Sequence, residues 1–280
     1  MVSDKGDLVI ALIGIDCATV PQKTGLALGE LRDGKVHILC WRTGTKNEPP
    51  ATIVTDWLHD RDKALIALDA PLGWPLALGK HLRIHSAGVP LRADPDQLFS
   101  RATDREIEER LGKRPLEVGA NLIARTAVAA LKLLDEIRQR TNPRRPIPLA
   151  WEPEEAEQWR AIEVYPAATF IGDIGHDVRN CEGSLEVLKE LDDLLDWSAV
   201  PDLKESKHAV DAAVCALAAA DFLCGRAIPP KPQDQKTACI EGWIWAPGRK
   251  IQATDKQIDA LVHELCGLTE DEVETVGGTA

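Results

Sequence analysis

The chain has 280 residues, enough to bury the core of one large α/β domain, and its formal net charge is −12 at pH 7. Because binding to phosphate backbones and anionic membranes depends on Lys and Arg, this charge argues against non-specific adhesion to either. The seven Cys residues form no C-x-x-C pair, which argues against a zinc site or a disulfide framework and predicts a reducing, cytoplasmic location.

The first predicted strand follows a polar N-terminal stretch, MVSDKGD, that lacks the features of a signal peptide. Residues 8–18, LVIALIGIDCA, are an apolar, β-branched run typical of a strand buried on both faces, and Asp16 lies at its end. A buried carboxylate needs a cation, a metal ion or backbone donors as its partner. Asp16 is therefore either the cap of the following turn or a functional carboxylate at the end of a central strand.

The next elements extend this sheet. Residues 25–31 and 35–41 are short apolar runs joined by an Asp-Gly turn, which predicts an antiparallel three-stranded meander. Residues 51–60 predict a helix, and residues 63–70, KALIALDA, predict a second buried strand that ends at Asp69. A right-handed helical crossover makes this strand parallel to the first, so two parallel strands carry an Asp at corresponding ends.

A long insertion follows the second buried strand. Residues 74–97 lose periodicity and carry scattered basic side chains, and segments of this kind are more often functional than accidental. Helices are predicted at residues 101–112 and about 118–140, and the second ends in a basic cluster, Arg138, Arg140, Arg144 and Arg145. This cluster either stabilises the helix C terminus or contacts phosphate. We expect one domain over residues 1–250 with a helical insertion at about 75–150, and a helical tail over residues 251–280.

Charged side chains also occur within two later apolar segments. Glu163 lies in a short predicted strand, where a Glu either faces water or has a function. Residues 204–224 predict a helix whose small residues allow close packing on a sheet, and its first turn carries Lys207, His208 and Asp211. The trio is either a solvated cluster or part of a site. The apolar run in this helix is too short and too interrupted by Asp to cross a bilayer, so no membrane partner is expected.

The acids predicted at the sheet ends, together with Asp211, define a candidate metal site. Asp16, Asp69, Asp211 and Glu163 would repel one another in one pocket unless a divalent cation lay among them. Oxygen ligands favour Mg²⁺ or Mn²⁺ over zinc. Two such ions about 3.5 to 4 Å apart support phosphodiester cleavage, in which one activates water and the other holds the leaving oxygen.

The order of elements and motifs resembles the ribonuclease H-like superfamily, especially its RuvC-type resolvases. More closely, it resembles domain-of-unknown-function family 429, whose members are called predicted RNase H-like nucleases. The resemblance rests on six segments in order: GIDCA (14–18), LDAPLGWP (68–75), RATDR (101–105), EVYPAATF (163–170), KHAVDAAVCALAAA (207–220) and EGWIWAP (241–247). It implies an α/β fold with a mixed five-stranded sheet, an antiparallel meander plus parallel strands, flanked by helices.

The resemblance also implies roles for individual residues. The implied metal ligands are Asp16, which would contact both ions, Asp69 and Asp211. His208 would pair with Asp211, Glu163 would be an extra ligand or a supporting group, and Lys207 would neutralise charge on phosphate. Substrate contacts fall on the inserted residues Arg101, Asp104 and Arg105. The implied partner is a short or structured nucleic acid, and the oligomeric state, a homo-oligomer included, stays open.

Two other classes of function fit parts of the sequence. An actin- or sugar-kinase-like nucleotide-binding protein needs two Gly-rich turns that bind phosphate. Gly25 and Gly29 are a weak match to one such turn, and the sequence offers no second. Residues 237–247 predict a strand or a hairpin arm with Trp243 and Trp245 on the same face. A catalytically silent interaction module fits the acidity and the eight Trp residues, of which Trp243 and Trp245 could form a binding edge. Nucleotide-dependent thermal protection would identify the first class, and full biological activity without Asp16 and Asp211 would identify the second.

Overall fold

A computed structural model describes residues 9–118, 121–141, 146–178 and 184–248. Contacts divide the chain into residues 1–248 and residues 249–280, and the whole second unit lies outside the described residues. The predicted tail helix and the basic residues Arg144 and Arg145 therefore lie outside them too. None of the described helices combines the length and the apolar character needed to cross a bilayer.

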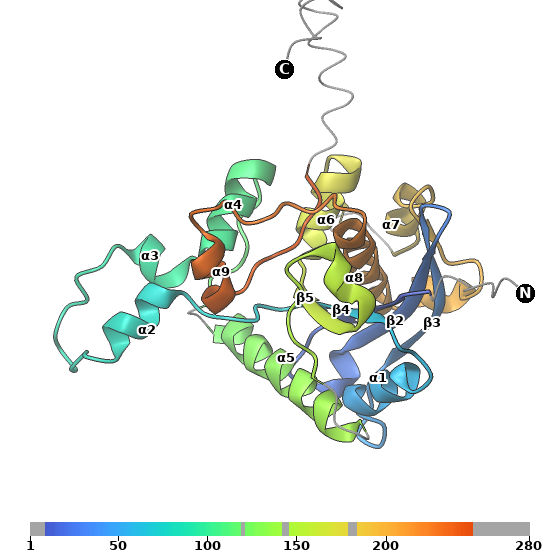
Figure 1. The fold of residues 1–280 in the computed structure, drawn as a ribbon, viewed down its shortest axis with the longest axis horizontal. Coiled ribbons are helices and arrows are strands. Elements are labelled where there is room, and N and C mark those ends of the chain that lie inside the picture. Colours follow the sequence, from blue (N-terminus) through green and yellow to red (C-terminus); the bar gives the residue numbers. More distant parts are fainter. Residues whose placement is uncertain (1–8, 119–120, 142–145, 179–183, 249–280) are drawn as a thin grey trace, which may run out of the picture. The chain divides into compact units, whose positions relative to one another are not determined.

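A mixed sheet of six strands forms the centre of the fold (Figure 1), in the order β5-β4-β1-β2-β3-β6. The strands are β1 (Ala11–Asp16), β2 (Gly25–Arg32), β3 (Lys35–Thr43), β4 (Ala64–Asp69), β5 (Trp159–Glu163) and β6 (Leu195–Asp196). β1, β2 and β3 form the predicted antiparallel meander, and β4 and β5 continue in parallel beside β1. The predicted α/β fold, in which an antiparallel meander is joined to parallel strands, is thus confirmed. The sheet has six strands rather than five because the two-residue β6 adds to the outer edge of β3.

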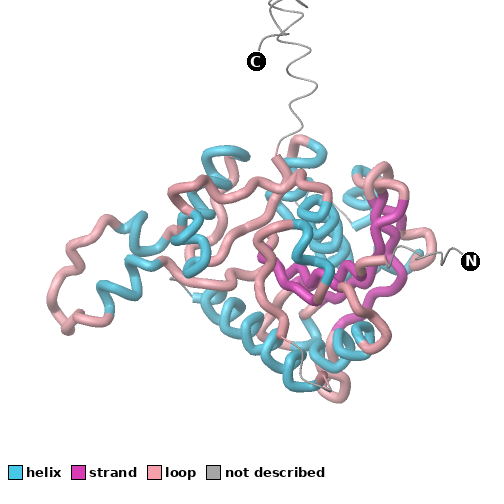
Figure 2. Tube along the Cα trace, in the orientation of Figure 1, coloured by secondary structure: helices cyan, strands magenta, loops and turns pink. Residues whose placement is uncertain are grey.

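Helices cover both faces of the sheet, as Figures 1 and 2 show. On one face, Leu12 and Leu65 pack against α8 (Lys207–Leu223). On the other face, Ile13 and Ile66 pack against α1 (Pro50–Leu58) and α5 (Asn121–Arg140). Because successive strand residues point to opposite faces, continuous apolar runs such as β1 and β4 fill both layers of core.

Two strand glycines let α8 approach the sheet backbone directly. A Cβ atom at Gly14 in β1 would lie 1.9 Å from the carbonyl oxygen of Ala212, and one at Gly25 in β2 would lie 1.9 Å from that of His208. No side chain fits at either position without displacing the helix. The helix face predicted to consist of small residues therefore packs against strand positions that are glycines.

The remaining helices lie mainly in the insertion between β4 and β5 and in the segments after β5. They are α2 (Leu76–Leu82), α3 (Pro95–Phe99), α4 (Ala102–Leu111), α6 (Pro166–Ile174), α7 (Ser184–Glu190) and α9 (Gln235–Glu241). The predicted strand at residues 237–247 was wrong in its first half, which is helix α9. The helix ends at Gly242, whose φ of 81° suits glycine, and only the following residues run extended beside Glu163.

Candidate active site

Asp16 and Asp69 end the two adjacent central strands of the sheet. β1 and β4 are parallel, and their register places Asp16 directly opposite Asp69. Opposite residues on neighbouring strands lie about 5 Å apart and point to the same face. Both side chains are partly buried. The carboxyl ends of parallel strands are where α/β sheets carry their sites, and two acids meet there.

Helix α8 brings a third group to this edge. The Nδ1 atom of His208 lies 2.6 Å from Oδ2 of Asp16, although 192 positions separate the two residues in the chain. Ser206 caps the helix by accepting a hydrogen bond from the backbone N–H of Ala209 at 3.3 Å. The first turn of α8 is therefore fixed both by its cap and by the contact of His208 with Gly25. The positive end of the helix dipole points toward the acids.

The surroundings of Asp16 disfavour its charge. Burial raises the pKa of Asp16 to about 6. The hydrogen bond with His208 opposes this shift, the charge of Asp211 adds to it, and the charge of Lys207 opposes it. Asp211 is thus close enough to repel Asp16, while Lys207 is exposed at the start of the helix. The arrangement is one that a cation would stabilise, because a cation favours the ionised carboxylate.

Two thiols, the buried Cys215 and the partly buried Cys17, respond to the charges of these acids. Burial raises the pKa of Cys215 on α8 well above its usual range, and the charges of Asp69, Asp16 and Asp211 raise it further. Cys215 donates to the carbonyl oxygen of Ile15 at 3.6 Å, so it lies directly beneath the end of β1. Burial likewise raises the pKa of Cys17, and Asp69 and Asp16 add to that shift. Both cysteines are therefore protonated neighbours of the acids and poor nucleophiles.

Glu163 belongs to a buried ion-pair network next to Asp69: β5 sets it opposite Leu68, and both acids line one cavity. The Arg101 side chain, 1% exposed, donates from both terminal nitrogens to the Glu163 carboxylate at 2.7 and 2.9 Å. Arg101 also donates to Asp104, at 2.8 Å between Nη2 of Arg101 and Oδ1 of Asp104. Burial raises the pKa of Glu163, and Arg101 opposes that shift. Glu163 and Asp104 are therefore engaged with Arg101, whereas Arg105 is exposed and donates to the carbonyl oxygen of Ser100.

Glu241 completes this network, although the sequence analysis did not single it out. Its two carboxylate oxygens accept hydrogen bonds from the backbone N–H groups of Leu76, at 2.7 Å, and Ala102, at 2.8 Å. Glu163 accepts a further one from Leu72 at 2.9 Å. The network thus fastens the segment that follows Asp69. In the sequence, Glu241 stands out only as the carboxylate that opens the apolar run EGWIWAP, which the pattern places in a strand.

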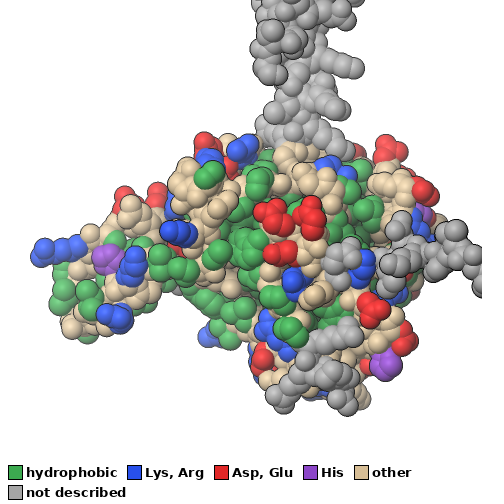
Figure 3. Space-filling view, viewed as in Figure 1, with side chains coloured by type: hydrophobic (Ala, Val, Ile, Leu, Met, Phe, Trp, Pro, Cys, Tyr) green, Lys and Arg blue, Asp and Glu red, His purple; other side chains and the backbone are tan. Residues whose placement is uncertain are grey.

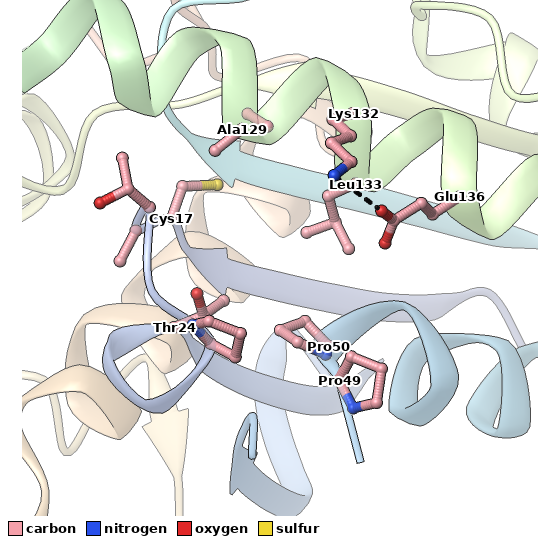
Figure 4. A pocket seen from close by; sticks show the side chains of 12 residues that line it. Cys17, Thr24, Pro49, Pro50, Ala129, Lys132, Leu133 and Glu136 are labelled. Carbon is pink, nitrogen blue, oxygen red and sulfur yellow. Dashed lines mark ion pairs between the residues drawn. The ribbon is translucent and has the colours of Figure 1, made fainter. Parts of the chain in front are cut away.

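Two cavities adjoin the acidic edge. One of about 470 Å³ lies beside Asp69 and extends to Arg101, Lys113 and Arg114. A smaller one of about 230 Å³ lies between the end of β1 and α5. Figure 4 shows this second cavity, with Cys17 on one side and Lys132 and Glu136 on the other, where they form an ion pair at 3.6 Å. Of the two cavities, the larger is lined by Asp69 and is the candidate substrate pocket.

The donor types at this edge fit a hard divalent cation. Asp16, Asp69 and His208 lie at this edge, Asp211 is close enough to repel Asp16, and Mg²⁺ and Mn²⁺ prefer oxygen ligands. Within the described ranges, no three His, Cys, Asp or Glu side chains stand together as a ready-made metal site. Asp16 instead contacts His208. Cation binding would therefore require these side chains to move from the arrangement described.

Comparison with known proteins gives a family and a distant likeness to solved structures. The family described as "Protein of unknown function (DUF429)" matches residues 14–235. No curated protein matches the chain. Among solved structures, the chain is similar to one described as a Thermus thermophilus RuvC structure, with 13% sequence identity and a TM-score of 0.36. That similarity covers 78% of this chain and 96% of the other.

Proposed function

The chain belongs to the DUF429 family, and we propose that it is a metal-dependent nuclease or phosphodiesterase that hydrolyses nucleic-acid phosphodiester bonds. The observation that carries this proposal is the register of β1 and β4, which sets Asp16 opposite Asp69 at the sheet edge. Asp211 lies close enough to raise the pKa of Asp16. Such a group of acids suits the binding of cationic cofactors and the handling of anionic substrates.

Asp16, Asp69 and Asp211 would hold one or two Mg²⁺ or Mn²⁺ ions. When bound, such an ion polarises the phosphoryl oxygen and lowers the pKa of coordinated water. The chain contributes the position of the carboxylates, which the strand register and the contact of α8 with Gly14 fix in the backbone. A site on rigid elements holds its geometry better than one on loops.

The side chains around these acids supply charge and proton control. His208 is 43% exposed, so its ring reaches solvent while its Nδ1 atom contacts Asp16, and it can hold a proton beside a bound phosphate. Lys207 is exposed next to it and would pair with phosphate charge at the N terminus of α8. Arg105 is exposed on α4 and remains our candidate for direct substrate contact.

The buried network acts by positioning. Glu163 and Arg101 are 3% and 1% exposed and bind each other where they line the cavity beside Asp69, so their charges are already paired. Through Leu72, the network holds the chain three residues beyond Asp69. We therefore assign Arg101, Asp104 and Glu163 to the support of the Asp69 segment.

The competing functions lose the features that suggested them. Gly25 lies within β2 and packs on the backbone of His208, so it forms no phosphate-binding turn. Trp243 and Trp245 are 2% and 5% exposed, with Trp245 packed against Phe222, so they form no exposed binding edge. An interaction module without catalysis remains a distinct outcome of the test below.

The test is cleavage by the full chain. Labelled branched DNA, single strands and RNA–DNA hybrids are incubated with wild type in Mg²⁺ or Mn²⁺, alongside Asp16→Asn and Asp69→Asn. We expect a cation-dependent cut by wild type and a loss of at least about 100-fold in either variant, since carboxylates that bind reacting groups supply several kcal/mol. Asp60→Asn is the matched control, because this carboxylate is 95% exposed and precedes β4 at its other end. No cleavage of any substrate, or equal cleavage by the variants, would refute the proposal.

A further inference from the structure

A basic arm projects from the otherwise acidic chain. We define the arm as residues 74–94, which comprise α2 and the loop that follows it; Figures 1 and 2 show it extending away from the sheet together with α3. Residues 74–93 contain Lys80, Arg83, Arg92 and two His but no Asp or Glu, and Asp94, the last residue of the arm, caps α3; the whole chain, in contrast, has a net charge of −12. Positive charge is thus concentrated on one protruding segment.

The cations of the arm are available to a ligand. Lys80, Arg83 and Arg92 are all exposed, and no ion pair links them to any carboxylate in the described part of the chain. Cations on the body are commonly paired: Arg114 binds Asp96 at 2.7 Å, for example. In Figure 3 the Lys, Arg and His side chains gather on the arm without acidic neighbours at its outer end. An anionic ligand would therefore meet little competition there.

Apolar surface accompanies this charge. Ile84 is 79% exposed, and Leu82 and Val89 are more than half exposed. A cavity of about 760 Å³ at the base of the arm is lined by Trp74, Ile84 and Ile240, with Lys80 and Arg83 at its edge. Single-stranded nucleic acid needs this combination, since its bases stack on apolar and aromatic side chains while cations follow its phosphates. A duplex, whose bases are stacked inside, would not use the apolar surface.

The base of the arm is fixed to the acidic edge. The chain runs from Asp69 through Leu72 into the arm, and Glu163 accepts a hydrogen bond from the Leu72 N–H. Glu241 accepts another from the N–H of Leu76, the first residue of α2. A strand bound along the arm would consequently be held near Asp69 by backbone contacts, with no flexible linker between the two.

We propose that the arm binds single-stranded nucleic acid, with Lys80, Arg83 and Arg92 pairing with phosphates and Trp74 and Ile84 packing against bases. This inference rests on the proposed function, because it is the proposed nuclease activity that would cleave the bound strand. It also explains how an acidic chain could bind a polyanionic substrate, because the basic arm would bind the phosphates. The body then contributes the carboxylates.

The test measures binding without cleavage. Full-length protein is titrated with a fluorescent single-stranded oligonucleotide in EDTA, and anisotropy gives Kd over a range of salt concentrations. The triple variant K80A/R83A/R92A is expected to bind about tenfold more weakly or worse. The slope of log K against log salt should fall by about 2, since each lost phosphate contact on a single strand removes about 0.7. Restoring the charge with K80R/R83K/R92K is expected to restore both.

The matched control K46A/K189A/K204A removes the same charge from exposed positions outside the arm and is expected to leave Kd and slope unchanged. The inference is overturned if wild type does not bind, if the arm variant binds like wild type, or if the control weakens binding equally. Preferential arm-dependent binding to phosphatidylserine vesicles over the oligonucleotide would overturn it as well. Binding without cleavage would refute the proposed nuclease and leave the arm assignment intact. Asp16-dependent cleavage with unchanged binding by the arm variant would do the reverse.

Discussion

Replacing Asp16 by Asn is expected to stabilise the cation-free protein at neutral pH. The Asp16 side chain is 16% exposed, and burial raises its pKa from 3.8 to about 6. At pH 7 the carboxyl group is mostly ionised, so the folded state contains a charge that its surroundings disfavour. An amide of nearly the same shape removes this charge and still accepts a hydrogen bond from His208.

The size of the effect follows from the pKa difference. A rise of about two pKa units corresponds to about 3 kcal/mol of stability, and for a chain of this size about 2 to 4 °C of Tm per kcal/mol gives about 6 to 12 °C. Because the folded pKa lies above the unfolded one, wild type is penalised only as pH rises. The advantage of Asp16→Asn should be absent below about pH 4, grow up to pH 6 and be complete above pH 7.

Thermal unfolding followed by circular dichroism in EDTA between pH 4 and pH 8 measures this difference. Asp60→Asn, which removes a 95% exposed carboxylate paired only at the surface with His59, should stay close to wild type throughout, because exposed pairs contribute little. Mn²⁺ should raise the Tm of wild type and leave the Tm of Asp16→Asn unchanged, because only the native carboxylate would bind the ion. A variant less stable than wild type at pH 7, or a difference that does not depend on pH, would show that the buried charge has been misjudged.

Three further substitutions test the packing and the charges. Gly25→Ala places a Cβ 1.9 Å from the α8 backbone and should lower the free energy of unfolding in urea by about 1 to 3 kcal/mol, whereas Gly79→Ala, with open space around the added Cβ, should not. Glu163→Gln leaves its buried arginine partner undercompensated and should cost about 3 to 5 kcal/mol in the same assay; unchanged stability would contradict the network. Asp211→Asn should lower the pKa of Asp16 because a like charge is lost, and a carboxyl NMR titration that shows a rise would contradict their proximity.

Local pattern was enough to predict the meander and the parallel strand β4, whereas the mixed sheet as a whole was implied by the family resemblance. β1 and β4 could be predicted because strands covered on both faces must be apolar throughout, and the Asp-Gly turn at residues 33–34 marked the meander. The parallel pairing of β1 with β4 followed from the intervening helix. β6 could not be predicted, because two residues at an edge carry no periodic pattern.

The candidate site was only partly predictable. The acids at strand ends could be named because buried charge is costly and therefore conspicuous in an apolar run. The role of Arg101 could not, since R-x-x-D looks the same on an exposed helix as in a core, and its partner Glu163 is 62 residues away. The helix α9 was mistaken for a strand because alternation at residues 243–247 was extended backward across Gly242, where the chain changes direction.

The contact of α8 with two strand glycines has a consequence for how this scaffold could diversify. The separation of His208 from Asp16 depends on main-chain atoms touching main-chain atoms, so exchanges among the surrounding aliphatic residues leave it unaltered. New substrate preferences would then arise most easily in the segment between β4 and β5, which can lengthen or shorten while both central strands keep their alignment. Attempts to alter substrate selectivity should therefore begin in that segment and keep Gly14 and Gly25.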